Sequence, residues 1–243
     1  HGERGGAVIH ETRLTFVSRN LIFGQLRGEH EIEDLNQARL DWNGSISRAY
    51  RDQPDTRASV FQLDPEFGYK FEDDSQSGWH FFSELEEMVY GLGFDWTQPL
   101  EEVDEDEPEH AAKLKFGGRV DTRDRDFYAR RLRFRPTFGM TVPVCATQVW
   151  DPACPDNTFS GENVGGDVFT IEDNTLETDA YNAGVEIFAG YAMADVHLAK
   201  NLRLIAGPRI EVATQSIRTF NQFEPDNPDF FREAEVTGQD SLP

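Results

Sequence analysis

The sequence predicts an all-β fold, an antiparallel meander of long strands that forms a partial transmembrane β-barrel wall with long extracellular loops. Polar and apolar residues alternate with a period of two over several separated segments, which is the signature of strands. Phe occurs 19 times and Gly 20 times in 243 residues, a composition typical of strands and turns. No run of about 18 apolar residues is present, so a transmembrane helix is excluded, whereas short alternating barrel strands remain possible.

The alternation predicts six strands, at about residues 14–30, 37–51, 81–98, 112–135, 180–198 and 202–220. In the second, the apolar face is expected to carry Leu40, Trp42, Gly44, Ile46 and Tyr50, opposite Asp41, Asn43, Ser45 and Ser47. In the third, the residues that share one face are Met88, Tyr90, Leu92, Phe94 and Trp96. Both segments therefore predict a sheet with one apolar face and one polar face.

The fourth segment ends in a cationic stretch, residues 130–135, RRLRFR. Arginines next to aromatic residues can bind nucleic acid, but this stretch alternates like a strand in a chain with a formal net charge of -22. We therefore expect these arginines to pair with neighbouring carboxylates inside the wall, and we expect no nucleic-acid partner.

The last two segments predict a hairpin. In residues 180–198, one apolar face is expected to carry Tyr181, Ala183, Val185, Ile187, Ala189, Tyr191 and Met193. The opposite face is expected to carry Asn182, Gly184, Glu186, Phe188 and Gly190. Pro208 falls inside the final segment, where it removes a ladder hydrogen bond, so we expect a bulge or a gap there.

The connections are expected to alternate in length. Residues 31–36 and 198–201 suit short turns, whereas 52–80 and 136–178 suit long loops, the first with a short hairpin around Phe67 to Phe71. Short turns on one side and long loops on the other are typical of outer-membrane barrels. The acidic block at 101–110 is expected to be a solvated turn, without the spacing of an EF-hand calcium loop.

A barrel wall places its apolar face against lipid and its polar face toward the lumen. Amphipathic rings prefer the level of the headgroups, and the candidates for such girdles are Trp42, Tyr50, Tyr90, Trp96, Tyr181 and Tyr191. A soluble sandwich would alternate in the same way, because the period cannot distinguish lipid from a second sheet.

Cys145 and Cys154 lie in a Pro- and Asp-rich segment, VCATQVWDPACPDN. The sequence favours a short-range disulfide in an exposed loop of an oxidising compartment, with two free thiols as the alternative. Two cysteines without an adjacent histidine do not make a metal site.

No motif indicates catalysis. None of the six histidines forms an HExxH pair or lies near a serine in a nucleophile elbow, and Walker and dinucleotide-binding loops are absent. We therefore expect no enzymatic activity, no cofactor and no metal.

Several stretches, in order, resemble the barrel domain of TonB-dependent outer-membrane receptors. They are GQLRGEHEI, LDWNGSISRAYRDQPDTR, GWHFFSELEEMVYGLGFDWTQPL, KLKFGGRVDTRDRDFYARRLRFRP and AGYAMADVHLAKNLRLIAGPRIE. The resemblance covers about residues 14–220 and rests on order and spacing. It implies a 22-stranded barrel with an N-terminal plug, located in the bacterial outer membrane, that imports a scarce nutrient with energy passed on by TonB.

The chain departs from this family pattern. It holds no plug domain, no TonB box and no terminal strand that ends in an aromatic residue, so all of residues 1–243 would be a middle segment of the barrel domain. The expected partners are outer-membrane lipid, the TonB complex through the missing plug, and a small-molecule ligand such as a siderophore or a glycan. Alternation makes Arg119, Arg209 and Glu211 the lumen-facing candidates for ligand binding.

Two other functions stay open. The first is a soluble secreted β-rich binding module, in which Trp79 and Trp150 of the loops would stack on a ligand; the same residues could instead anchor the loops. The second is a small complete outer-membrane pore of about 8–10 strands.

Overall fold

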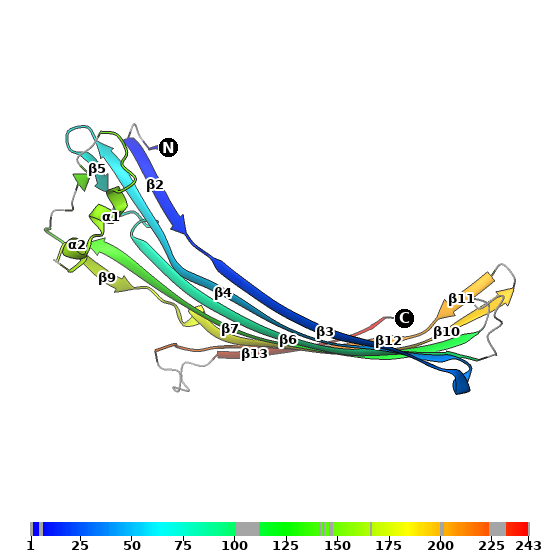
Figure 1. Ribbon diagram of the computed structural model, residues 1–243. Coiled ribbons are helices and arrows are strands. Elements are labelled where there is room, and N and C mark those ends of the chain that lie inside the picture. Colours follow the sequence, from blue (N-terminus) through cyan, green and yellow to red (C-terminus); the bar gives the residue numbers. More distant parts are fainter. Residues whose placement is uncertain are drawn as a thin grey trace.

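The computed structural model describes residues 2–4, 7–100, 112–140, 142, 144–145, 148–165, 167–199, 202–223 and 232–242. The chain is 72% strand and 7% helix. Within the described residues, 13 strands form one antiparallel sheet that curls into a half-barrel (Figure 1). The predicted all-β antiparallel class is therefore confirmed. No helix among the described residues has the length and apolar character needed to cross a membrane.

Four long strands form the middle of the sheet. In spatial order they are β4 (Ala38–Asp64), β6 (Trp79–Pro99), β7 (Lys113–Pro136) and β10 (Ala180–Ala199). Beyond β10 follow β12 (Arg209–Thr219) and β13 (Arg232–Leu242). On the other flank, β4 pairs with β2 (Ala7–Thr15) and β3 (Ser18–Ile32), and β1 (Gly2–Arg4) pairs with β2. In the described part of the chain, β3 and β13 are outer strands of an open sheet.

The short elements lie at the two ends of the long strands (Figure 1). At one end are β5 (Gly68–Phe71), β8 (Val144–Cys145), α1 (Cys154–Thr158), α2 (Gly161–Gly165) and β9 (Phe169–Asp173), which we call the cap. Near the opposite end are the 3-10 turn Glu33–Leu35 and β11 (Leu202–Ala206). A second 3-10 turn, Glu177–Asp179, leads into β10.

The strands predicted at 81–98, 112–135 and 180–198 are confirmed to within two residues at each end. The single strand predicted at 14–30 is wrong, because β2 and β3 are separate strands that together extend from Ala7 to Ile32.

The prediction that residues 52–80 form a loop is wrong for its first part. The strand expected at 37–51 continues to Asp64, through a polar stretch that contains Pro54. Proline cannot donate a ladder hydrogen bond, and the pairing with β6 shifts register between Gln53 and Thr56, where an irregularity accommodates it. The hairpin expected around Phe67 to Phe71 is confirmed, since β5 pairs with the end of β4.

The gap expected at Pro208 is also present. The segment predicted as one strand at 202–220 is divided into β11 and β12, with Gly207 and Pro208 between them. The backbone N–H of Ala192 donates to the Pro208 carbonyl at 3.1 Å. A Cβ atom on Gly207 would lie 2.0 Å from the Ala192 carbonyl oxygen, so this close approach requires glycine.

Two predicted connections lie wholly or partly outside the described residues: the acidic block at 101–110, and positions 200–201 of the turn at 198–201. The region expected to be a loop at 136–178 contains most of the cap.

The main buried core lies between the cap and the end of the sheet. It consists of Phe61, Tyr69, Phe71, Val142, Cys154 and Phe169. Phe71 packs edge to face against Phe61 and Phe169, with ring centroids 6.0 Å and 5.6 Å apart. The cap is therefore a small folded unit built around aromatic residues, whereas much of the sheet has exposed apolar side chains.

Candidate functional site: an apolar band and a charged face

The register of the long strands determines which side chains share a face of the sheet. Across β4, β6, β7, β10 and β12, one row of partners is Gly44, Leu92, Val120, Phe188 and Val212. The adjacent row is Asn43, Gly93, Arg119, Ala189 and Glu211. Because neighbouring rows point to opposite faces, the sheet presents an apolar face and a polar face.

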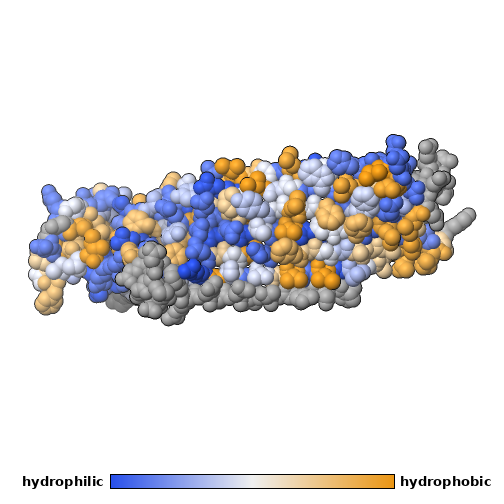
Figure 2. Space-filling model, turned by 90° about the horizontal axis from the view of Figure 1, so that it is seen from below, coloured by the Kyte–Doolittle hydropathy of each residue, from blue (hydrophilic) through white to orange (hydrophobic). Residues whose placement is uncertain are grey.

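The apolar face carries a continuous set of large side chains, which we call the apolar band. It consists of Leu26, Leu40, Trp42, Ile46, Tyr90, Leu92, Phe94, Trp96, Leu114, Phe116, Val120, Phe188, Ile210 and Val212. Leu26 is 72% exposed and Leu92 is 63% exposed. Figure 2 shows hydrophobic residues gathered over the part of the molecule away from the cap, with hydrophilic residues prominent in the middle. Such a contiguous exposed patch marks an interaction surface.

Charged residues replace apolar ones on the same face in the rows nearer the cap. On the same face, the next rows carry Arg48, Glu86, Asp124, Asp126 and Asn182, which we call the charged belt. The Arg48 guanidinium donates to the Glu86 carboxylate at 2.7 Å, and the Asn182 amide donates to Asp126. Glu186 is a charged residue at the border of the apolar band in β10.

The opposite face, which we call the charged face, is built from arginine–carboxylate pairs two residues apart on one strand. Arg119 donates to Asp121 at 2.5 Å and 2.9 Å. Arg209 donates to Glu211 at 2.8 Å, and Arg39 pairs with Asp41 at 2.9 Å in the same way. The predicted lumen candidates Arg119, Arg209 and Glu211 therefore lie on one face, where Arg119 and Glu211 occupy the same row on either side of Ala189.

Three further contacts on the charged face were not apparent from the sequence. The Tyr191 hydroxyl donates to Asp95 at 2.6 Å across Gly117, where a Cβ atom would lie 2.7 Å from the tyrosine ring. Glu87 accepts a hydrogen bond from Arg125 Nε at 2.8 Å and lies 3.9 Å from Arg123 Nε. These contacts link neighbouring strands, so the charged face is a cross-strand network.

The two sets of β10 residues predicted to share a face are confirmed by the register, but the set predicted to be the apolar face lies on the charged face. The register places Ile187 opposite Asp121 and Val185 opposite Arg123, on the charged face, whereas Phe188 belongs to the apolar band. Both faces of β10 carry apolar residues, so its own alternation could not decide between them. For the same reason Tyr181 and Tyr191 do not share a face with Trp42, Tyr50, Tyr90 and Trp96.

Trp79 and Trp150, both expected in loops, are partly buried, and Trp79 is the first residue of β6. Trp150 stacks on His10 with ring centroids 3.7 Å apart, and it packs edge to face against Phe61 and Tyr69. The indole N–H of Trp79 donates to the Ser75 carbonyl at 2.7 Å, and Arg133 lies over its ring at 5.5 Å. These contacts favour loop anchoring over ligand stacking for both residues.

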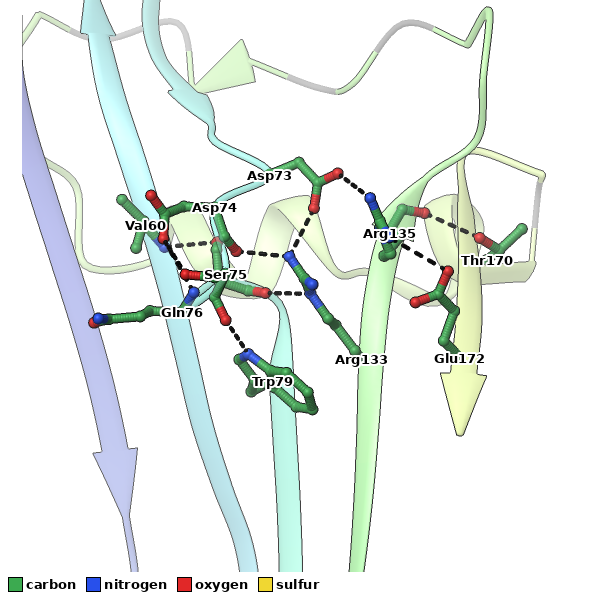
Figure 3. Close-up of polar contacts among 11 residues, drawn as sticks. Val60, Asp73, Asp74, Ser75, Gln76, Trp79, Arg133, Arg135, Thr170 and Glu172 are labelled. Atoms are coloured by element: carbon green, nitrogen blue, oxygen red, sulfur yellow. Dashed lines mark hydrogen bonds and ion pairs between the residues drawn. The ribbon is translucent and has the colours of Figure 1, made fainter. Parts of the chain in front are cut away.

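Arginines of β7 hold the loop that precedes β6 (Figure 3). Arg133 donates to the Asp73 carboxylate at 3.0 Å and to the Asp74 carbonyl at 2.7 Å. Arg135 lies 3.2 Å from Asp73 and 3.7 Å from Glu172. The predicted pairing of this cationic stretch with neighbouring carboxylates is therefore confirmed.

A disulfide joins Cys145 to Cys154, with 5.7 Å between their Cα atoms. It ties β8 to α1 within the cap. Nearby on β6, burial lowers the pKa of His80, and Asp55, whose carboxylate lies 3.2 Å from the imidazole, partly opposes this effect. Neutral His80 is therefore the form that the fold favours.

No protein family, curated protein or solved structure matches the chain. Among the described residues, no group of three or more His, Cys, Asp or Glu side chains is arranged to hold a metal ion. The two faces of the sheet are therefore the features of the described residues that bear on function.

Proposed function

We propose that the chain forms part of the wall of a bacterial outer-membrane β-barrel, with the apolar band against lipid and the charged face toward a hydrated lumen. The supporting observation is an open antiparallel sheet with exposed large apolar side chains on one face and paired charges on the other. In a soluble sandwich, residues such as Leu92 would be buried under a second layer. Contact with lipid hydrocarbon in place of water removes the free-energy cost of leaving these apolar side chains on the surface.

The height of the apolar band fits this proposal. On β7 the rows of the band run from that of Thr122, the partner of Tyr90, to that of Leu114. Over these eight residues the strand rises about 27 Å, at about 3.4 Å per residue. A tilt of about 40° reduces this rise to about 20 Å across the membrane, close to the band of about 25 Å in known barrels.

The strands continue well past the apolar band. β4 has 27 residues, whereas a barrel strand needs only about 9–11 residues to cross the membrane. The additional length carries the cap away from the band, beyond the charged belt. A disulfide in the cap suits the oxidising surroundings outside the cell. We therefore assign the cap to the extracellular side.

The proposed protein is a TonB-dependent receptor that takes up a small molecule such as a siderophore or a glycan. The resemblance of residues 14–220 to that family supports this assignment, together with the charged face. Paired arginines and carboxylates suit a water-filled interior that contacts a plug, because their hydrogen bonds tolerate hydration. In this proposal the TonB complex acts through a plug domain on another part of the protein.

The four tryptophans provide a test of the wall, because they divide between the two regions. Trp42 and Trp96 belong to the apolar band, whereas Trp79 and Trp150 are held at the cap end. Four single-tryptophan variants, with phenylalanine at the other positions, are reconstituted into vesicles of phosphatidylcholine with brominated acyl chains. Bromine quenches indole fluorescence only at short range.

The expected result is strong quenching of Trp42 and Trp96 and little quenching of Trp79 and Trp150. The cap tryptophans are the matched controls, since all four variants share one preparation and one lipid. Equal quenching of all four residues, or quenching of the cap pair alone, would refute the proposed orientation.

A further inference from the structure

We infer that the cap contains a binding pocket for a single uncharged sugar ring, separate from the passage of the proposed receptor. The pocket has a volume of about 190 Å³ and lies between the segment around α1 and the ends of β2, β4, β6 and β7. Pockets for drug-sized ligands have about 300–1,000 Å³, so this one suits one ring with its substituents. The inference goes beyond the proposed function, because it requires no membrane.

The strand register places the pocket on the face that carries the apolar band. Leu14 of β2 lies opposite Arg57 of β4, which in turn lies opposite His80 of β6, and all three line the pocket. His80 shares its face of β6 with Tyr90 and Leu92, because residues an even number apart on a strand point to the same side. The charged face is on the other side of the sheet, so a ligand in this pocket is outside the proposed lumen.

Much of the pocket wall is apolar. The His80 ring lies edge-on to Phe134, with ring centroids 4.7 Å apart, and Phe134 lies 5.5 Å from Phe159. Pro152 and Pro155 add apolar surface from the side of α1. A pyranose ring carries C–H groups on its faces and hydroxyls around its edge, so its faces match this wall. Ligand sites combine such apolar walls with a few placed polar groups.

The buried polar groups of the pocket point to a ligand with hydroxyls. The hydroxyl oxygen of Thr12 is buried and has no hydrogen-bond partner among the described residues. Ser59 lies directly opposite Thr12 and is only 6% exposed, and both residues line the pocket. A buried hydroxyl without a partner costs free energy. A sugar hydroxyl is both donor and acceptor, so it can satisfy Thr12 in either role.

The charges beside the pocket favour an uncharged ligand. Arg57 and Asp156 have side chains that are 54% and 79% exposed, and their charged groups lie 3.6 Å apart. Arg57 Nε also donates to the Asp55 carboxylate at 2.5 Å. Arg57 is therefore compensated and offers no excess positive charge to an anion. Its remaining N–H groups and the Asp156 carboxylate can still form hydrogen bonds with hydroxyls at the edge of a neutral ring.

The test is a titration of the full chain in micelles of a detergent without a sugar headgroup. The probes are the methyl glycosides of glucose, galactose and mannose, and saturation-transfer NMR detects binding. The expected result is saturation of the ring C–H protons of at least one glycoside. Trp79 also lines the pocket, so its emission in the single-tryptophan variant should change with the same dissociation constant.

Two variants remove polar groups of the pocket. Thr12→Val keeps the shape of the side chain and removes the hydroxyl, and Asp156→Ala removes the carboxylate beside the pocket. Binding should weaken about threefold to tenfold for Thr12→Val and about tenfold for Asp156→Ala, as expected for a neutral and a charged hydrogen bond.

The controls make the same changes outside the pocket lining. Thr137→Val removes another buried hydroxyl without a partner among the described residues, and Glu162→Ala removes an acidic residue from the first turn of α2. Both controls should change the dissociation constant less than about twofold.

The outcomes separate a sugar site from other pockets. Cyclohexylamine and cyclohexanecarboxylate present a ring with a positive or a negative charge. Binding of either compound without binding of any glycoside, no binding at all, or equal weakening by pocket and control variants overturns the inference. Thr12→Val decides alone if Asp156→Ala disturbs α1, because the hydroxyl that it removes has no partner among the described residues. The quenching of Trp42 and Trp96 by brominated lipid is unaffected by any of these results, so the wall and the pocket fail separately.

Discussion

Replacement of Leu92 by arginine tests whether the apolar band faces lipid. Leu92 lies near the middle of the band on β6, between Tyr90 and Phe94 on the same face, and it is 63% exposed. The substitution therefore removes little packing within the protein. An arginine on the lipid face near the bilayer midplane costs about 2–4 kcal/mol of folding free energy. An exposed position in water would change stability by less than about 0.5 kcal/mol.

The assay is denaturant unfolding of the chain in lipid vesicles, followed by tryptophan fluorescence. Ser45→Arg is the matched control, because it places arginine at nearly the same depth on the charged face. There, Ser45 and Asp121 approach each other over Gly91, so an arginine has a carboxylate within reach. Ser45→Arg is expected to reduce the folding free energy by less than about 1 kcal/mol, since positions that face the lumen tolerate charge. If Leu92→Arg costs less than about 0.5 kcal/mol in lipid, or no more than Ser45→Arg, the lipid-facing assignment is wrong.

Three further predictions concern the cap, His80 and Trp42. Replacing Cys145 and Cys154 with alanine should destabilise the cap by about 2–3 kcal/mol, because the disulfide closes a short loop, and hydrogen exchange should rise in the cap alone. Because burial lowers the pKa of His80 below its ordinary value of 6.5, stability should be complete above that pH and decrease below it, where the unfolded chain binds the additional proton. Denaturation midpoints between about pH 5 and 8 measure this slope, which His80→Asn should flatten. Gly28→Ala should cost about 1–3 kcal/mol and displace the Trp42 indole, because the new Cβ atom would lie 2.3 Å from Trp42 Nε1; a shift in Trp42 emission checks it.

The alternation of polar and apolar residues was sufficient to predict the bounds of a strand where one face of that strand is clearly polar. The bounds of β6 and β7 were predictable because Leu92 and Phe94 alternate with glycine and aspartate, and Phe116 and Val120 alternate with lysine and arginine. Pro208 marked the break between β11 and β12 because it lacks an N–H donor. These features depend only on residues within one segment.

Features that depend on contacts between segments could not be predicted. Both faces of β10 carry apolar side chains, so only its pairing with Asp121 and Arg123 on β7 reveals that Ile187 and Val185 lie on the charged face. The polar second half of β4 resembled a loop, but its pairing with β2, β5 and β6 makes it a strand. In both cases register between distant segments decides the outcome.

The charged face also explains how a chain with a formal net charge of -22 could line a passage. Same-strand pairs such as Arg119 with Asp121 and Arg209 with Glu211 are neutral as units. Much of the excess negative charge is instead carried elsewhere, including seven carboxylates between residues 101 and 110 and the aspartates of the charged belt. A face of neutral pairs neither traps nor repels a charged ligand strongly, because each arginine is already compensated. Changing Asp121 to asparagine should therefore leave an uncompensated Arg119 and favour anion passage, a selectivity shift that liposome swelling with anionic and neutral solutes can measure in a closed barrel that contains this wall.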